Sequence, residues 1–150
     1  MKRTENNGTD GSSSLLLDTI NENELDIFPE LIDTVSSAHK TILIKHNYYS
    51  SDNDHGRALL SAFLDVLSDE SDEIAKIILI DSGAHLLVPQ DPCHKKFRNI
   101  TGDGNIKLYC CRESLDRYAD EEPIQDNIDL ISAQSIALEL LDSVNVITLE

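Results

Sequence analysis

The chain has 150 residues, with 28 acidic against 12 basic side chains and a formal net charge of −16. This length fits one domain whose core is large enough to fold without disulfides or metals. The charge argues against general binding to nucleic acid or to an anionic membrane surface, because both need clustered lysines and arginines. Solubility is the simplest explanation of the charge, and an acidic docking face is the alternative.

Targeting and redox signals favour a cytoplasmic protein without a membrane span. No run approaches the roughly 20 apolar residues that cross a bilayer. Residues 6–14 are polar where a signal peptide needs an apolar segment. The three cysteines are an odd number, which argues against a disulfide framework. No Cys/His cluster has the spacing of a zinc site, so we expect no metal.

The first 39 residues differ in composition from the rest of the chain. Residues 1–14 are polar and rich in glycine and serine, which is typical of a disordered tail. Within residues 15–39 the later apolar positions have helical spacing, and Pro29 suits a first helical turn. We expect this N-terminal helical extension to pack on the domain or on a neighbouring subunit.

From residue 40 onward, apolar runs alternate with amphipathic stretches. The runs predict strands at 41–46, 75–80, 105–110, 128–131 and 144–149. Helices are expected at 55–67, 92–100 and 112–118, and from an N-cap at Ser132 to about residue 143. This alternation predicts an α/β domain over residues 40–150, with a five-stranded, mostly parallel sheet covered by helices on both faces.

The loop after the first predicted strand, residues 48–56, occupies the place where flavodoxins and nucleotide binders hold phosphate. A phosphate loop needs bare amides and no competing negative charge. This loop contains Asp52 and Asp54, and its single glycine, Gly56, stands at its far end. Binding of phosphate or a flavin is therefore disfavoured, and no organic cofactor is implied. We expect Asp52 or Asp54 to cap the following helix.

Two adjacent cysteines, Cys110 and Cys111, end the third predicted strand, directly before a helix. Chemistry in α/β folds gathers at the carboxyl edge of the sheet. A helix N-terminus and a neighbouring arginine, here Arg112, favour thiolate over thiol. Because successive strand residues face opposite sides of a sheet, we expect Cys110 to be buried and Cys111 exposed. The alternative is that both are small buried hydrophobic residues.

The run Asp81, Ser82, Gly83 and His85 follows the second strand. One interpretation is a turn in which Gly83 relieves strain and His85 is solvated. The other is the wall of a pocket beside the cysteines, with His85 as a base or as a group that orients a persulfide. Cys93 stands at another predicted helix start, and we expect it to be a surface thiol.

Several motifs in the same order resemble one family. They are the loop 51–56 leading into a helix, the run 81–86 followed by Pro92, and the run 111–118. They resemble the DsrE-like sulfurtransferase domain, most closely the C-terminal domain of YedF-type proteins linked to selenium metabolism. The resemblance covers residues 40–150 and implies a three-layer α/β/α fold that forms homo- or hetero-oligomers. Active members carry sulfur as a persulfide on a cysteine at the end of the third strand. That position falls on Cys111 when counted from the helix that follows and on Cys110 when counted from Gly104; we prefer Cys111.

The chain departs from this family at several positions. YedF-type domains carry the second cysteine of a C-x-x-C pair where this chain has Ser114, and Tyr49 and Ser51 stand in place of two glycines. Residues 1–39 contain no cysteine and are too short for the TusA-like sulfur-carrier domain of full YedF-type proteins. An internal disulfide relay is therefore not expected.

The sequence leads to two main hypotheses, each with a homo-oligomer expected. In the first, Cys111 accepts sulfane sulfur from a partner protein and passes it on without a metal or cofactor. The residues expected around that thiol are Asp81, Ser82, Gly83, His85, Arg112 and Ser114. In the second, the chain is a catalytically inactive DsrE-like module for binding or oligomerisation. A flavodoxin-type binder of small molecules is a third and less favoured interpretation.

Overall fold

The computed structural model describes residues 39–119 and 127–150. The predicted tail at 1–14 and all but the last residue of the predicted extension at 15–39 lie outside this range. Within it, no helix is both long and apolar enough to cross a membrane. The elements in chain order are β1 (Lys40–Ile44), α2 (Asp54–Asp69), η2 (Ser71–Glu73), β2 (Ile74–Leu79), η3 (Asp81–Leu87), α3 (His94–Thr101), β3 (Lys107–Cys111), α4 (Arg112–Tyr118), β4 (Ile128–Ile131), α5 (Ala133–Asp142) and β5 (Asn145–Leu149).

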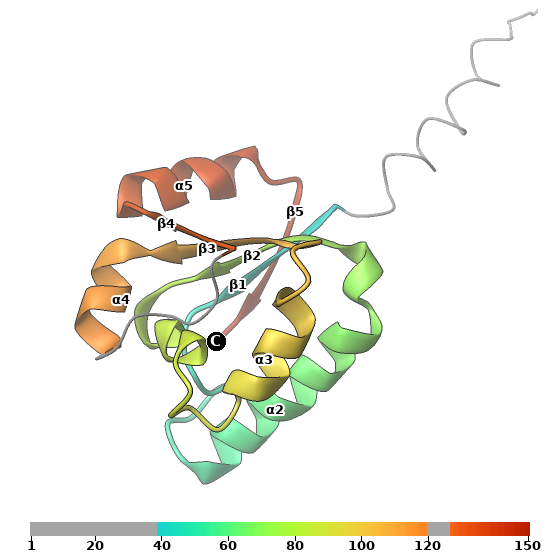
Figure 1. Cartoon of the computed structure of the whole chain (residues 1–150), viewed down its shortest axis with the longest axis vertical. Helices are drawn as coiled ribbons and strands as arrows, with labels where there is room; N and C mark the ends of the chain where they lie inside the picture. The colour runs from blue at the N-terminus through green and yellow to red at the C-terminus, as the bar shows by residue number, and fades with distance from the viewer. Residues whose placement is uncertain (1–38, 120–126) are drawn as a thin grey trace, which may run out of the picture. The chain divides into compact units, whose positions relative to one another are not determined.

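The five described strands form one sheet in the order β4-β3-β2-β1-β5, and every pairing between them is parallel. The inner strand β2 ends in three buried residues, Ile77 to Leu79, as a strand covered on both faces should. In Figure 1, α2 and α3 lie below the sheet and α5 lies above it. The predicted three-layer α/β/α architecture is therefore confirmed.

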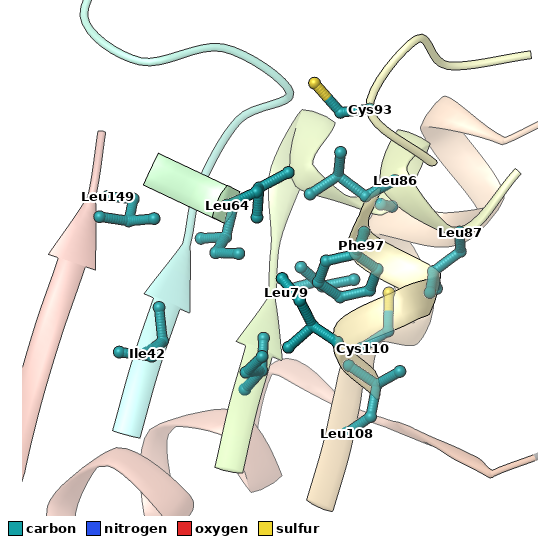
Figure 2. Packing of buried hydrophobic residues seen from close by; sticks show 14 of the residues in the cluster. Ile42, Leu64, Leu79, Leu86, Leu87, Cys93, Phe97, Leu108, Cys110 and Leu149 are labelled. Carbon is teal, nitrogen blue, oxygen red and sulfur yellow. The ribbon is translucent and has the colours of Figure 1, made fainter. Parts of the chain in front are cut away.

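Two clusters of buried side chains form the core, one on each face of the sheet. The larger one lies between the sheet and the helices α2 and α3. It includes Leu79 and Leu108 from the strands, Leu64 from α2 and Phe97 from α3 (Figure 2). The smaller cluster consists of Leu43, Ile78, Cys111 and Ile136. Among the described elements, α2, α3, η3 and α4 thus contribute to the cluster on one face, and α5 contributes to the cluster on the other.

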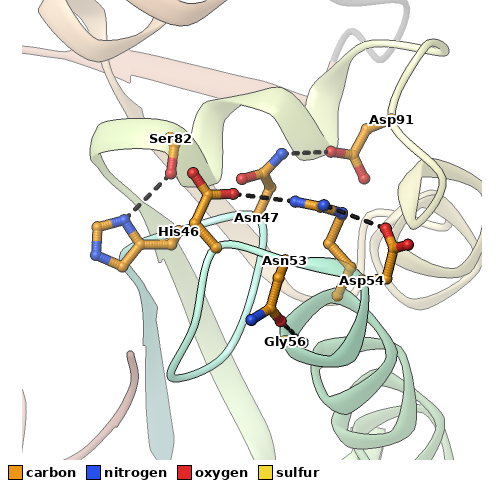
Figure 3. Close-up of polar contacts among 9 residues, drawn as sticks. His46, Asn47, Asn53, Asp54, Gly56, Ser82 and Asp91 are labelled. Atoms are coloured by element: carbon orange, nitrogen blue, oxygen red, sulfur yellow. Dashed lines mark hydrogen bonds and ion pairs between the residues drawn. The ribbon is translucent and has the colours of Figure 1, made fainter.

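The expected cap of α2 is wrong. The N-cap is Asn53, whose side chain accepts a hydrogen bond from the Gly56 N–H at 2.8 Å (Figure 3). Asp52 and Asp54 instead pair with Arg57, at 3.0 and 3.4 Å. Neither aspartate is the cap because α2 starts at Asp54, and the capping side chain belongs to the residue directly before the first helical residue.

The segment after β2 is a 3₁₀ helix, η3, where the sequence predicted a break. It packs closely on the end of β1. The Gly83 N–H donates hydrogen bonds to the carbonyl oxygen of Lys45, directly after β1, at 3.3 Å and to that of Ile80 at 2.9 Å. A Cβ at Gly83 would lie 2.6 Å from the Ile44 carbonyl oxygen, so a larger residue would displace η3. Gly83 therefore serves the packing of this edge.

Replacing Phe97 with alanine tests the larger cluster. Phe97 is fully buried, so Phe97→Ala should lower the free energy of unfolding by about 3–5 kcal/mol. Urea denaturation followed by circular dichroism measures the change. The control is Leu138→Ala, at an exposed position of α5, which should change stability by no more than about 0.5 kcal/mol. Equal effects of the two substitutions would contradict this description of the core.

Candidate functional site

The cysteine pair ends β3 directly before α4. The Cys110 side chain belongs to the larger cluster, beside Leu108 and Phe97 (Figure 2). Cys111 belongs to the smaller cluster on the opposite face, with Ile136 of α5. The predicted alternation is confirmed, but the expectation that Cys111 is exposed is wrong. Only 6% of Cys111 is accessible to solvent, because α5 covers the face on which it lies.

Burial controls the titration of two of the three cysteines. Desolvation raises the pKa of Cys110 to about 12, with a smaller contribution from Cys111 and an opposing one from the positive charge of Arg112. The expected surface thiol, Cys93, is also buried, and its pKa is raised first by desolvation and then by the Asp91 carboxylate. Neither thiol is suited to thiolate chemistry at neutral pH.

The Cys111 thiol donates a hydrogen bond to Glu113 Oε1 at 3.3 Å. The pKa of Glu113 is lowered, first by its own backbone N–H and then by this thiol, so its carboxylate stays ionised at neutral pH. A thiolate at Cys111 would therefore face a second negative charge. Arg112, which the sequence predicted as support for the thiolate, is exposed at the start of α4.

A cavity of about 460 Å³ opens beside Cys111. Asp81 and Ser114 supply its polar side chains, while α5 supplies an apolar wall. The residues that line it are Ile80, Asp81, Cys111, Ser114, Ala133, Ile136, Ala137 and Leu140. The cavity thus brings the predicted Asp81, Cys111 and Ser114 together at the carboxyl edge of the sheet.

Ser114 holds the start of η3 in place. Its Oγ accepts a hydrogen bond from the Asp81 backbone N–H at 2.7 Å. Asp81 has a φ of +52°, a left-handed conformation that residues other than glycine adopt only when their surroundings enforce it. Ser114 is therefore a structural hydrogen-bond acceptor for a strained position.

The other predicted residues of this edge, Ser82 and His85, line a second cavity of about 330 Å³. Asp81 borders both cavities. The other residues that line this second cavity are His46, Asn47, Tyr48, Asp52 and Tyr118. Sequence reasoning missed His46, Tyr48 and Tyr118 as site residues. The available signal was the place of His46 and Tyr48 after the first strand, at the same edge as the cysteines.

The polar contacts of the second cavity do not form a catalytic relay. His46 Nδ1 lies 3.1 Å from Ser82 Oγ (Figure 3). The same nitrogen lies 3.6 Å from Asp81 Oδ2. A serine nucleophile and its orienting carboxylate must contact opposite nitrogens of the imidazole, whereas here both approach the same one. Asp81 also accepts a hydrogen bond that raises the pKa of Tyr118, whose ring meets His85 edge-on. This geometry suits binding of a polar group better than activation of Ser82.

In the described part of the chain, no group of three or more His, Cys, Asp or Glu side chains is placed to hold a metal ion.

Comparison with solved structures bears on the fold. No family model matches the chain, and no curated protein matches it. The crystal structure of the YchN protein from E. coli matches with a TM-score of 0.52 and 16% sequence identity, over 74% of this chain and 98% of YchN. At this identity the likeness establishes the fold, which is the DsrE-like α/β/α arrangement. The narrower likeness to YedF-type proteins stays a prediction.

Alkylation should distinguish the three thiols. We expect iodoacetamide at pH 8 to modify Cys111 before Cys110 and Cys93, because Cys111 lines a cavity. With a pKa of about 12, Cys110 is ionised in roughly one molecule in 10⁴ at pH 8. Peptide mass mapping over time measures the order. In guanidinium chloride the three rates should converge, and faster modification of Cys110 in the folded chain would contradict the assignment.

Removing the Ser114 hydroxyl should destabilise the edge. Ser114→Ala leaves the Asp81 N–H without its acceptor and should lower the free energy of unfolding by about 1 kcal/mol. Urea denaturation measures this change. Ser68→Ala, at an exposed position of α2, is the matched control and should change stability by less than about 0.5 kcal/mol. An equal effect of both substitutions would show that Ser114 does not hold Asp81.

Proposed function

We propose that this chain carries sulfane sulfur as a persulfide on Cys111. The supporting observation is the cavity of about 460 Å³ that Cys111 lines at the carboxyl edge of the sheet, where α/β folds place their chemistry. Cys110 and Cys93 lie in the larger buried cluster instead, and the pKa of each is raised. The sequence resemblance to DsrE-like sulfurtransferases supports the same choice of cysteine.

The transfer is a thiol–persulfide exchange with a partner protein. The Cys111 thiolate attacks the outer sulfur of the donor's persulfide, the sulfur–sulfur bond of the donor breaks, and the donor leaves as a thiolate. Cys111 then holds one extra sulfur atom in the cavity, against the apolar side chains of Ile136 and Leu140. The same reaction in reverse passes the sulfur to an acceptor thiol.

Glu113 makes the rate of transfer sensitive to the partner. The Cys111 thiol donates a hydrogen bond to the Glu113 carboxylate, whose negative charge lies beside the sulfur that would attack. Because Glu113 is exposed, a basic side chain of a docked donor can pair with it and remove the charge that a thiolate would face. A docked donor of this kind therefore accelerates the transfer, whereas a small donor reacts with the free protein more slowly.

The second candidate is a catalytically inactive DsrE-like module for binding or oligomerisation. The hydrogen bond from Cys111 to Glu113 favours it, because it places a carboxylate, and not a cation, beside the sulfur. Ser114 favours it as well, since its Oγ is engaged as an acceptor for the Asp81 N–H. This candidate predicts that no sulfur is taken up and that Cys111 reacts like an ordinary thiol.

Intact-mass analysis tests sulfur carriage. After incubation with thiosulfate or a low-molecular-weight persulfide, we expect the wild type to gain the mass of one sulfur atom and to lose it on reduction. Cys111→Ser should abolish the gain, and Cys110→Ser should retain it if the variant folds. No adduct on the wild type, or an unchanged adduct on Cys111→Ser, sinks the sulfur-carrier proposal and supports the inactive module.

A companion experiment tests the role of Glu113. Glu113→Gln should raise the initial rate of adduct formation severalfold, because it removes the negative charge beside the attacking sulfur. Asp116→Asn changes the net charge equally at another exposed position of α4 and should leave the rate unchanged. Equal rates for the two variants would remove Glu113 from the mechanism.

A further inference from the structure

We propose that two copies of this chain join through β5, pairing antiparallel so that their sheets form one continuous sheet. β5 lies at the end of the strand order, next to β1. Among the described strands, none pairs with its outer edge. This inference is independent of sulfur chemistry, since β5 is separated from β3, the strand that carries Cys111, by β2 and β1.

The backbone of β5 leaves a defined set of groups for a partner strand. The Lys45 N–H bonds to the Leu149 carbonyl oxygen at 3.2 Å, so Leu149 directs its backbone groups toward β1. Successive residues of a strand direct these groups to opposite sides. Val146 and Thr148 therefore direct their N–H and C=O groups outward. Such an unpaired row is a template for another strand.

The side chains at this edge are apolar and exposed. Val144, Val146 and Ile147 have exposed fractions of 86, 39 and 44%, and Leu141 at the end of α5 has 81%. Natural edge strands avoid pairing by means of charged residues, proline or bulges. Residues 144–149 contain no charge and no proline, in a chain whose net charge is −16. An uncharged, apolar edge is a surface on which two such acidic molecules can approach each other.

The sequence of β5 suits a second copy of itself. In an antiparallel pair centred on Ile147, Val146 faces Thr148 of the second copy and the two Ile147 residues face each other. Val146 and Thr148 are the residues with outward backbone groups, so they form the hydrogen-bonded pairs of the ladder in both copies. This arrangement has two-fold symmetry, which closes the assembly at a dimer.

Electrostatics allow this register. The charged residue next to the paired segment is Glu150, which forms an ion pair with Lys45 at 2.7 Å. In the antiparallel register, Glu150 of one copy faces Val144 of the other. The two Glu150 residues then lie about 20 Å apart along the strands, at about 3.4 Å per residue. That separation exceeds the screening length of about 8 Å at physiological ionic strength.

Light scattering coupled to gel filtration tests the dimer on the full chain. We expect a mass twice the 16.7 kDa of one chain. Val146→Lys places a charge at the centre of the paired edge and should give a monomer. Thr148→Pro removes an outward N–H that the sheet itself does not use and should also give a monomer. Asn99→Lys, an equal charge change at an exposed position of α3, should stay dimeric.

A cysteine cross-link tests the register. The two Ile147 residues would form a non-hydrogen-bonded pair, whose Cα atoms lie about 4.5 Å apart and within the range that a disulfide spans. Ile147→Cys should therefore form a covalent dimer under mild oxidation, well before Leu138→Cys on the exposed face of α5. A monomeric wild type, a dimer that survives both edge variants, or cross-linking of Ile147→Cys no faster than the control would each overturn the proposal. Circular dichroism confirms that each variant is folded.

Discussion

The parallel pairing of β1, β2 and β3 is the constraint on which the candidate site depends. Their register places Ile44, Leu79 and Cys110 side by side, so the residues that follow them reach the same edge. A slip of β3 by one residue would exchange the two faces, moving Cys111 into the larger cluster and Cys110 to the face of α5. Burial on both faces opposes that slip, because the slip would move each side chain of β3 to the opposite face of the sheet.

The same packing separates structural and chemical roles at neighbouring positions. Cys110 contributes to the core, and the burial that makes it useful there raises its pKa far above neutrality. Cys111 is one residue further and lies on the face packed by α5, where a cavity remains. A reaction at Cys111 would therefore leave the core packing of Cys110 unchanged.

Asp81 connects the two cavities at this edge. Its left-handed backbone is held by the Ser114 hydroxyl from α4, and the packing of Gly83 on Ile44 fixes η3 against β1. Its carboxylate approaches His46 in the polar cavity, while the residue also borders the cavity of Cys111. A ligand that contacts His46 would thus lie next to a residue that is shared with the cysteine site.

The strands were predictable from the sequence because each is a short apolar run, and in the inner strands β1 and β2 these runs are buried. The predicted strands agree with the structure to within two residues, and the Ser132 cap of α5 is confirmed. The exposure of Cys111 was not predictable in the same way. Alternation along β3 identifies the face on which a side chain lies, whereas the helix that covers this face is set by the crossover from β4 to β5.

The second cavity escaped prediction for a related reason. The predicted first strand ran to His46, but β1 ends at Ile44, so His46 belongs to the loop and faces the polar cavity. Tyr118 comes from the end of α4, more than sixty residues away in sequence. Only the parallel topology brings such distant residues together, and nothing in the local pattern around either one indicates the other.

Ser114 limits how a persulfide on Cys111 could release its sulfur. A persulfide can be discharged within one molecule only when a second thiol reaches it. Position 114 holds a hydroxyl that is engaged with the Asp81 N–H. Cys110, although adjacent in sequence, lies on the other face of the sheet among the residues of the larger cluster. On the proposed function, the thiol that receives the sulfur from Cys111 must therefore come from another molecule, which makes the transfer intermolecular in both directions.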